Sequence, residues 1–215
     1  MTVLMTALLF LLLALLGVHL WLGFGDDLSA HDHDVEPGGG ERFLNPQGPS
    51  TGHRGVVEAF QARSGEIAPL NVGQMINYVR ELMDSFADGR SFAAEFRPLD
   101  VDGVRGEWVI APGADPSRRA LYLHGGAFFA GSPLSHRTMT SQFSERCGAA
   151  VLALDYRLKP EHRRADGIED CRRAYRWILD NGPDGQSPLE TFLVGGDSAG
   201  GNLALMITAW SRDQG

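Results

Sequence analysis

The residues best suited to chemistry in this chain are a serine and its neighbours, Gly196-Asp197-Ser198-Ala199-Gly200. They follow a strand-like apolar run at 191–194 and precede a helical pattern. A sharp turn from strand to helix needs glycine, and it would leave the Ser198 hydroxyl exposed at a helix N-terminus, where developing negative charge is favoured. That setting suits a nucleophile in acyl transfer. The alternative is a glycine-rich turn whose serine caps the helix. The strand and helix on either side favour the nucleophile.

A second glycine-rich segment, His124-Gly125-Gly126-Ala127, ends an earlier apolar run at 120–123. Acyl transfer places negative charge on the carbonyl oxygen, and proteins stabilise it with N–H donors that are fixed in advance. Glycines at the end of a strand allow the backbone to present such donors. His124 is a candidate general base, but because it leads the glycine pair we interpret it as a residue that holds the loop. Together the two segments indicate a serine nucleophile that faces an oxyanion site.

Apolar patterns show which elements position these segments. Residues 93–99 and 106–111 alternate in polarity like strands and flank Asp102-Gly103, a hairpin turn signal. Short, wholly apolar runs at 120–123, 149–154 and 191–194 are typical of strands buried on both faces of a parallel sheet. Helical patterns lie at 135–147, at 167–181 and from 199 to about 210. This order predicts an α/β fold, with a mostly parallel sheet covered by helices on both faces.

Two further helices are predicted upstream of the strands. Val56, Val57 and Phe60 share one helical face, and the second helix has apolar residues at helical spacing between Met75 and Phe86. Asn71 is the expected N-cap of this second helix, and Gly89 follows its end.

Three motifs make the chain from about residue 55 onward resemble the hormone-sensitive-lipase-like branch of the α/β-hydrolases, a group of carboxylesterases and arylacetamide-deacetylase-type enzymes. They are residues 124–128 with Gly131-Ser132, the stretch DYRLKPEH at 155–162, and GDSAGGN at 196–202. The resemblance implies an α/β-hydrolase fold and an enzyme that cleaves small to medium lipophilic carboxylic esters through an acyl-enzyme on Ser198. It assigns the oxyanion hole to backbone N–H groups, those of Gly125, Gly126, Ala127 and Ala199.

The resemblance has consequences for other segments too. Ala127 stands where the family often has a third glycine, and little effect is expected because the N–H remains. The stretch 155–162 is expected to be scaffold, whereas 163–166 departs from the apolar, proline-containing sequence usual there. The helices within 55–90 are expected to contribute to a cap over the acyl pocket. Met75, Met83 and Phe86 either line that pocket or are ordinary core residues.

The rest of a catalytic triad is not expected within these residues. In this fold the order is Ser, then Asp or Glu, then His, but no histidine follows Ser198, and the one acid after it is Asp213. Fifteen residues of helix would place Asp213 about 22 Å away. We therefore expect a C-terminally truncated sequence, with the triad Asp and His beyond residue 215 and no meaningful turnover by the fragment. The alternative from another class is a catalytically inactive small-molecule receptor on the same fold.

The N-terminal part has a different character. Residues 3–22 are almost wholly apolar, and about 30 Å of helix matches a bilayer core. We expect residues 1–24 to be a transmembrane anchor that makes the protein membrane-bound. The alternative is a cleaved signal sequence, with Gly23-Phe24-Gly25 as the cleavage site and a secreted or periplasmic product. Residues 25–54 read as an acidic Gly/Pro linker, and in it we interpret His31–Asp34 as solvated polarity rather than as a metal site. Residues 55–90 are then the cap-like helices and 91–215 a partial catalytic domain.

Composition narrows the partners. The formal net charge of −8 argues against a nucleic-acid partner. Cys147 and Cys171 form no CxxC pair and have no His or Cys cluster around them, so zinc is not expected, while a disulfide stays open. Nothing in the sequence implies an organic cofactor. The expected partners are a small-molecule ester and, through the N-terminal helix, a membrane.

Overall fold

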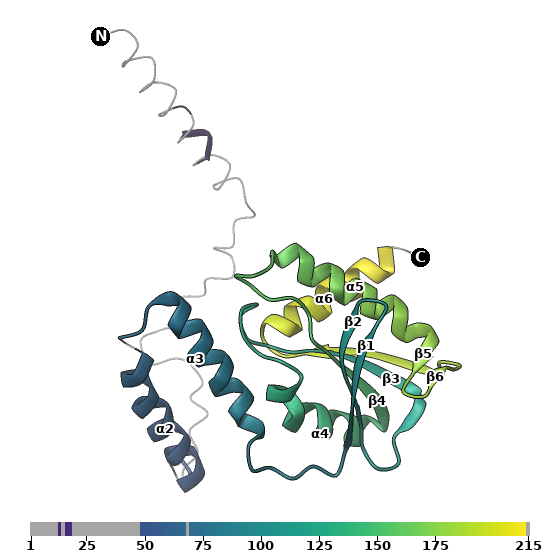
Figure 1. Cartoon of the computed structure of the whole chain (residues 1–215), viewed down its shortest axis with the longest axis horizontal. Coiled ribbons are helices and arrows are strands. Elements are labelled where there is room, and N and C mark those ends of the chain that lie inside the picture. Colours follow the sequence, from purple (N-terminus) through teal and green to yellow (C-terminus); the bar gives the residue numbers. More distant parts are fainter. Residues whose placement is uncertain (1–12, 14–15, 19–47, 68, 214–215) are drawn as a thin grey trace, which may run out of the picture. The chain divides into compact units, whose positions relative to one another are not determined.

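The computed structural model describes residues 13, 16–18, 48–67 and 69–213 (Figure 1). Residues 1–57 and 58–215 form two compact units, and each is considered by itself. The predicted anchor and most of the predicted linker, His31–Asp34 included, lie outside the described residues and stay predictions. In the described ranges every helix is too short or too polar to cross a membrane. The same ranges contain no group of three or more His, Cys, Asp or Glu that could hold a metal ion.

Two helices precede the strands, as predicted. α2, Thr51–Ile67, begins four residues earlier than expected because Ser50 caps it: the Ser50 Oγ accepts a hydrogen bond from the His53 N–H at 3.1 Å. α3, Val72–Asp84, has the predicted N-cap. The Gln74 N–H donates to the Asn71 side chain at 3.0 Å, and the Gln74 side chain accepts from the Asn71 N–H at 3.1 Å. This reciprocal capping fixes the start of α3.

The sheet contains the five predicted strands in the order β1-β2-β4-β3-β7. β1, Glu95–Val101, and β2, Val104–Ile110, form the predicted hairpin, and Asp102 and Gly103 both have positive φ as its turn requires. β2 pairs antiparallel with β4, Ala149–Leu154. β3, Asp115–Leu123, pairs parallel with β4 on one side and with β7, Thr191–Gly196, on the other. The carboxyl ends of these three parallel strands therefore meet at one edge of the sheet.

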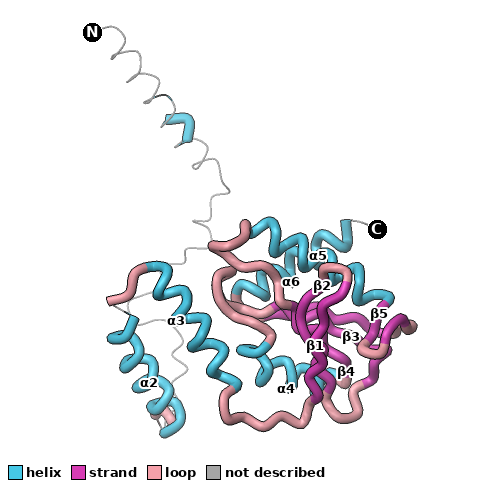
Figure 2. Tube along the Cα trace, in the orientation of Figure 1, coloured by secondary structure: helices cyan, strands magenta, loops and turns pink. Residues whose placement is uncertain are grey.

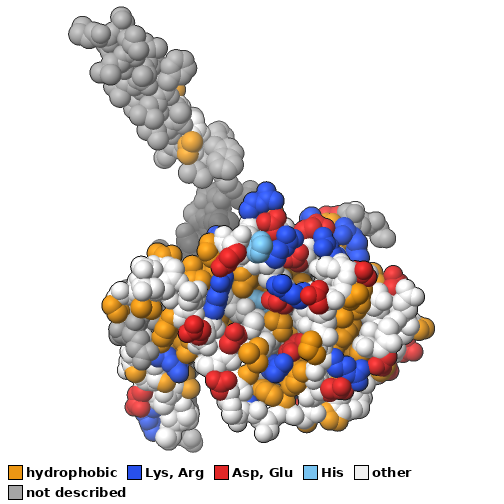
Figure 3. Space-filling model, in the orientation of Figure 1, with side chains coloured by type: hydrophobic (Ala, Val, Ile, Leu, Met, Phe, Trp, Pro, Cys, Tyr) orange, Lys and Arg blue, Asp and Glu red, His pale blue; other side chains and the backbone are white. Residues whose placement is uncertain are grey.

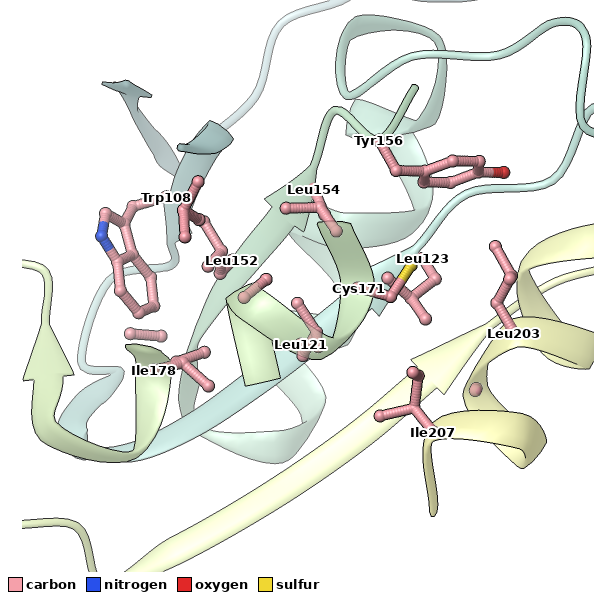
Figure 4. Close-up of a cluster of buried hydrophobic side chains, with 14 residues drawn as sticks. Trp108, Leu121, Leu123, Leu152, Leu154, Tyr156, Cys171, Ile178, Leu203 and Ile207 are labelled. Carbon is pink, nitrogen blue, oxygen red and sulfur yellow. The ribbon is translucent and has the colours of Figure 1, made fainter. Parts of the chain in front are cut away.

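Helices cover both faces of this sheet (Figures 1 and 2). α5, Arg164–Asp180, and α6, Ala199–Asp213, cover one face, and α4, Arg137–Cys147, covers the other after the short 3₁₀ turn η3, Leu134–His136. Leu121 and Leu123 point into the cluster under α5 and α6, which Figure 4 shows, while Ala120 and Tyr122 pack beneath α4 with Phe143. The alternation along β3 thus supplies both cores.

The hairpin of β5, Asn181–Gly182, and β6, Gly185–Gln186, was not predicted. Arg119, which is fully buried at the start of the β3 core, holds the chain around it. Its guanidinium donates to the carbonyls of Ile178 and Leu179 at the end of α5, and to those of Ser187 and Pro188 after the hairpin, at 2.8–3.1 Å. Arg119 thus hydrogen-bonds to the chain both before and after the β5–β6 hairpin.

Charged side chains on the unit formed by residues 58–215 are mixed rather than segregated by sign. On the face shown in Figure 3, acidic and basic side chains lie next to one another over the sheet and helices. Ion pairs such as Arg105–Asp155 at 2.8 Å and Arg97–Asp184 at 2.7 Å belong to this pattern. Cys147 and Cys171 are both free thiols, and burial raises the pKa of Cys171.

Candidate active site

Ser198 lies on the turn between β7 and α6, at the carboxyl end of the parallel strands. Its backbone has φ +50°, a left-handed conformation that costs a non-glycine residue roughly 1–2 kcal/mol. The side chain is exposed, and its Oγ forms no hydrogen bond with any of the described residues. A strained residue with an exposed, unengaged hydroxyl at a helix N-terminus has the geometry expected of a nucleophile.

Glycine is required on this turn because it packs directly against the end of β3. A Cβ on Gly200 would lie 2.6 Å from the His124 carbonyl oxygen, closer than real Cβ contacts allow. A Cβ on Gly196 would lie 2.5 Å from the Leu123 carbonyl oxygen. The two segments that the sequence singled out are thus in backbone contact, and any larger residue at these positions would push them apart.

The loop after β3 has an unusual backbone. Gly126, Ala127 and Phe128 have φ values of +119°, +53° and +65°. Ala127 therefore occupies a conformation that favours glycine. This backbone conformation explains why the family often has a third glycine here, a point that our argument from the N–H group alone did not consider. In the described part of the chain, no group accepts a hydrogen bond from the N–H of Gly126, Ala127 or Ala199.

The predicted set of donors needs one correction. The Gly125 N–H donates to Asp197 Oδ1 at 3.0 Å, so this donor is already engaged. Free N–H groups remain on Gly126, Ala127 and Ala199, and their role as oxyanion donors stays a prediction.

Asp197 is the residue that the sequence reasoning missed. Its Oδ1 accepts from three groups: the Gly125 N–H, the Tyr122 hydroxyl at 3.1 Å and the His136 Nε2 at 3.3 Å. Burial acts to raise the pKa of Asp197, but the hydrogen bonds from His136, Gly125 and Tyr122 outweigh it and hold that pKa below its usual value. The position of Asp197 inside the serine motif could have marked it as a candidate. The motif does not, however, show which atoms the Asp197 carboxylate contacts.

His124 has the structural character that the sequence suggested. It is 1% exposed, and its Nδ1 donates to the Gly125 carbonyl at 2.8 Å. Its ring stacks on Tyr156 at 4.3 Å between centroids, and the Tyr156 hydroxyl donates to the His124 carbonyl at 2.7 Å. Burial lowers the pKa of His124 to about 4. The ring is thus engaged with the loop, and it makes no hydrogen bond to Ser198 within the described residues.

The segment 155–162 is scaffold around this loop, as the resemblance implied. Besides the Tyr156 contact, the Lys159 N–H donates to the Phe128 carbonyl at 2.8 Å. The following departure from the family pattern is accommodated by polar contacts: at the start of α5 the Arg163 N–H donates to the Asp166 carboxylate at 2.9 Å, and the two side chains form an ion pair. Arg164 lies over the Phe128 ring at 4.6 Å from its centroid.

α3 is fastened to the same loop. The Arg80 guanidinium donates to the Phe129 carbonyl at 2.7 Å, to the Lys159 carbonyl at 2.9 Å, and with two nitrogens to the Glu161 carboxylate at 2.8 Å. Near the end of α3, Asp84 accepts a hydrogen bond from the Ser132 hydroxyl. None of the α3 residues is fully buried: Met75 and Met83 are half-buried, and Phe86, in the turn after α3, is 43% exposed. Whether these three side chains line an acyl pocket or are ordinary core residues stays a prediction.

Among the described residues, Ser198 is the candidate nucleophile of a predicted catalytic triad. Asp213 lies in the last turn of α6 and pairs with Arg212 at 2.9 Å. No histidine or carboxylate of the described part hydrogen-bonds to the Ser198 hydroxyl. The described residues therefore bring together the candidate nucleophile Ser198 and the loop of residues 124–128, here called the oxyanion loop after its predicted role, and no candidate base among them hydrogen-bonds to Ser198.

Comparisons with known proteins agree with this geometry. A family characterised by the alpha/beta hydrolase fold matches residues 120–215. An acetyl-hydrolase of Streptomyces hygroscopicus is 44% identical over 118 residues, 54% of this chain and 38% of that protein. Esterase LipI of Mycobacterium tuberculosis is 40% identical over 119 residues, 55% of this chain and 37% of that protein.

Solved structures are similar as well. EstE5, in a crystal soaked with p-nitrophenyl butyrate, has a TM-score of 0.58 and 40% identity over 65% of this chain and 46% of that one. An esterase from the bacterial hormone-sensitive lipase family has a TM-score of 0.60 and 36% identity over 70% of this chain and 50% of that one. The chain spans less than half the length of the two curated relatives and about half of these structures.

Proposed function

We propose that the protein, which is similar to esterases of the α/β-hydrolase fold and of the bacterial hormone-sensitive lipase family, hydrolyses small to medium lipophilic carboxylic esters, with Ser198 as its nucleophile. One observation carries the proposal. The Ser198 hydroxyl is exposed and unengaged on a strained turn that lies in backbone contact with a loop of unpaired N–H groups. This pairing of a nucleophile with a preformed anion site is what acyl transfer needs.

In the proposed reaction, Ser198 Oγ attacks the ester carbonyl carbon and its proton passes to a histidine base that lies outside residues 1–215. The carbonyl oxygen becomes an oxyanion and accepts hydrogen bonds from the N–H groups of Gly126, Ala127 and Ala199. Each such donor typically lowers the barrier by about 3 kcal/mol. Collapse of this intermediate expels the alcohol, which takes the proton from the histidine, and leaves an acyl-enzyme. Water then hydrolyses the acyl-enzyme by the same steps in reverse.

The substrate class rests on the relatives. An acetyl-hydrolase and an esterase are among the similar curated proteins, and p-nitrophenyl butyrate is the ester used with EstE5. Short acyl chains on a lipophilic alcohol are therefore the substrates to test first. Neither the described residues nor the relatives' names supply an observation that favours the receptor alternative.

The test uses the protein expressed from its full natural reading frame. Fluorophosphonate labelling and p-nitrophenyl butyrate hydrolysis are measured for the unsubstituted protein, for Ser198→Ala and for Ser211→Ala. Ser211 is on the same helix, and its hydroxyl donates to the Thr208 carbonyl at 2.9 Å, so it is a matched control. We expect Ser198→Ala to abolish labelling and to lower kcat by about 10⁶-fold, while Ser211→Ala keeps both. Equal labelling of the Ser198→Ala protein, or no labelling of the unsubstituted one, would contradict the proposal.

A further inference from the structure

His136 is a buried histidine that the proposed reaction does not use. It is 5% exposed and ends the 3₁₀ turn η3 that precedes α4. Its Nε2 lies 3.3 Å from Asp197 Oδ1, on the residue next to the nucleophile. A hydrogen bond between these two atoms requires a proton on His136 Nε2, because a carboxylate can only accept.

The orientation of the His136 ring is fixed from its other nitrogen. Nδ1 lies 2.8 Å from the Ser135 Oγ and 3.3 Å from the Ser132 carbonyl oxygen. Ser132 and Ser135 in turn hold each other: the Ser132 N–H donates to the Ser135 Oγ at 2.8 Å, and the Ser135 N–H donates to the Ser132 Oγ at 3.0 Å. The imidazole is thus clamped at both ends, and Nε2 has a set position.

Asp197 Oδ1 contacts both His136 and the oxyanion loop. The same oxygen accepts from the Gly125 N–H, and the next two residues carry the free N–H groups that are to bind the oxyanion. Tyr122 also donates to this oxygen, but its ring is held in the core against Phe143, at 5.8 Å between centroids. His136 therefore connects a separate element, η3, to Asp197, the residue at which the Ser198 turn contacts the oxyanion loop.

We propose that His136 is a positioning residue, which through Asp197 Oδ1 sets the oxyanion donors at their working distance from Ser198. The inference rests on the proposed hydrolase function for its kinetic consequence. Displacing catalytic groups by about 1 Å, or losing one oxyanion donor, typically lowers the rate on the order of 10²-fold. His136 is buried and forms no hydrogen bond with Ser198 among the described residues, so we expect its substitution to lower kcat and to leave KM nearly unchanged.

Two substitutions separate the two ring nitrogens. In His136→Gln the side-chain amide nitrogen reaches the place of Nε2 and can still donate to Asp197. In His136→Asn the shorter amide reaches only the place of Nδ1, so it keeps the contacts with Ser132 and Ser135 and loses Asp197. Both variants leave a polar group in the same buried site, which makes each the control for the other in folding.

The kinetic measurement uses the full-length protein and p-nitrophenyl butyrate. We expect His136→Asn to lower kcat roughly 10²-fold with KM within about threefold, and His136→Gln to restore kcat to within about threefold of the unsubstituted protein. Melting temperatures are measured alongside. Equal loss of kcat in both variants, or a His136→Asn kcat within about threefold of native, would overturn the inference.

A second readout does not need hydrolysis. His124-Gly125 is the only His-Gly pair in these 215 residues, so labelling histidine carbonyl carbon and glycine nitrogen marks the Gly125 amide in an NMR spectrum. We expect His136→Asn to move this resonance and His136→Gln to leave it near its native position, because the hydrogen bond to a carboxylate dominates the amide shift.

The two readouts keep the failures apart. If the unsubstituted protein shows no Ser198-dependent turnover, the proposed function fails, and the Gly125 resonance alone decides on His136. A resonance that moves in His136→Asn and returns in His136→Gln supports the positioning role. A resonance that is unmoved in both variants, or moved equally by both, overturns it.

Discussion

At the level of single residues, the lowered pKa of His124 makes the stability of the folded protein depend on pH. The folded protein holds this histidine neutral, because burial lowers its pKa from an ordinary 6.5 to about 4. The unfolded chain therefore binds a proton as the pH falls through 6.5 while the folded chain does not, and the folded state loses stability until the pH reaches about 4. The difference in pKa corresponds to about 3 kcal/mol.

We predict that the free energy of unfolding falls by about 2–3 kcal/mol between pH 7 and pH 4.5, and that His124→Asn flattens this decline. The Asn amide can still donate to the Gly125 carbonyl but does not titrate. Glu161 and Asp166, whose pKa values lie at about 2 beside Arg80 and Arg163, lose their contribution only at lower pH. Urea unfolding at several pH values measures the effect. An equally steep decline in the His124→Asn protein would contradict it.

What the sequence could predict at this level depended on the kind of residue. Ser198 and the glycines beside it were identified because backbone strain restricts which residue types can stand there. The engagement of Gly125 and the roles of Asp197 and His136 could not be found in this way. They depend on which side-chain atoms meet across segments that are 61 to 75 residues apart in the chain, and spacing along the sequence does not encode that.

Among the elements, α3 depends on polar contacts for its place. The helix has no fully buried residue, although most of its apolar side chains are half-buried, and Arg80 supplies four hydrogen bonds to the two loops beneath it. Through Asp84 and Ser132, the end of the same helix also contacts the segment that orients His136. The predicted cap helix is therefore connected to the oxyanion loop by hydrogen bonds at two points.

We predict that Arg80→Leu releases α3 while the sheet keeps its stability. Amide hydrogen exchange in residues 75–84 should accelerate roughly tenfold or more, with exchange in β3 and β4 unchanged. Glu81→Gln, an exposed neighbour on the same helix, is the matched control and should exchange like the unsubstituted protein. Unchanged protection of α3 in Arg80→Leu would show that its apolar contacts suffice.

Element types were predictable from periodicity and element ends less so. β4 was predicted at its observed bounds because a wholly apolar run between a glycine and an aspartate leaves no other choice. β3 begins five residues before its apolar run, at Asp115, because the parallel pairing with β4 and β7 extends into polar residues. The β5–β6 hairpin was missed because the interaction that holds this region comes from Arg119, more than 60 residues upstream of it.

For the molecule as a whole, the sequence predicts a membrane anchor at residues 1–24. The apolar run at 3–22 has the length of a spanning helix, about 30 Å. We predict that the full-length protein resists extraction from membranes by alkaline carbonate and that deleting residues 1–24 releases it. A protein that starts after Gly25 by mass spectrometry and is recovered in the soluble fraction would instead identify a cleaved signal sequence.

The shared acceptor Asp197 Oδ1 limits how this site can be engineered. One oxygen atom satisfies donors from a strand, a loop and a 3₁₀ turn, so Tyr122, Gly125 and His136 share a single acceptor. Residues with a common partner do not contribute additively. We therefore expect the effects of single substitutions at these positions to be poor guides to their combinations, so that only a library that varies them jointly can identify which combinations work.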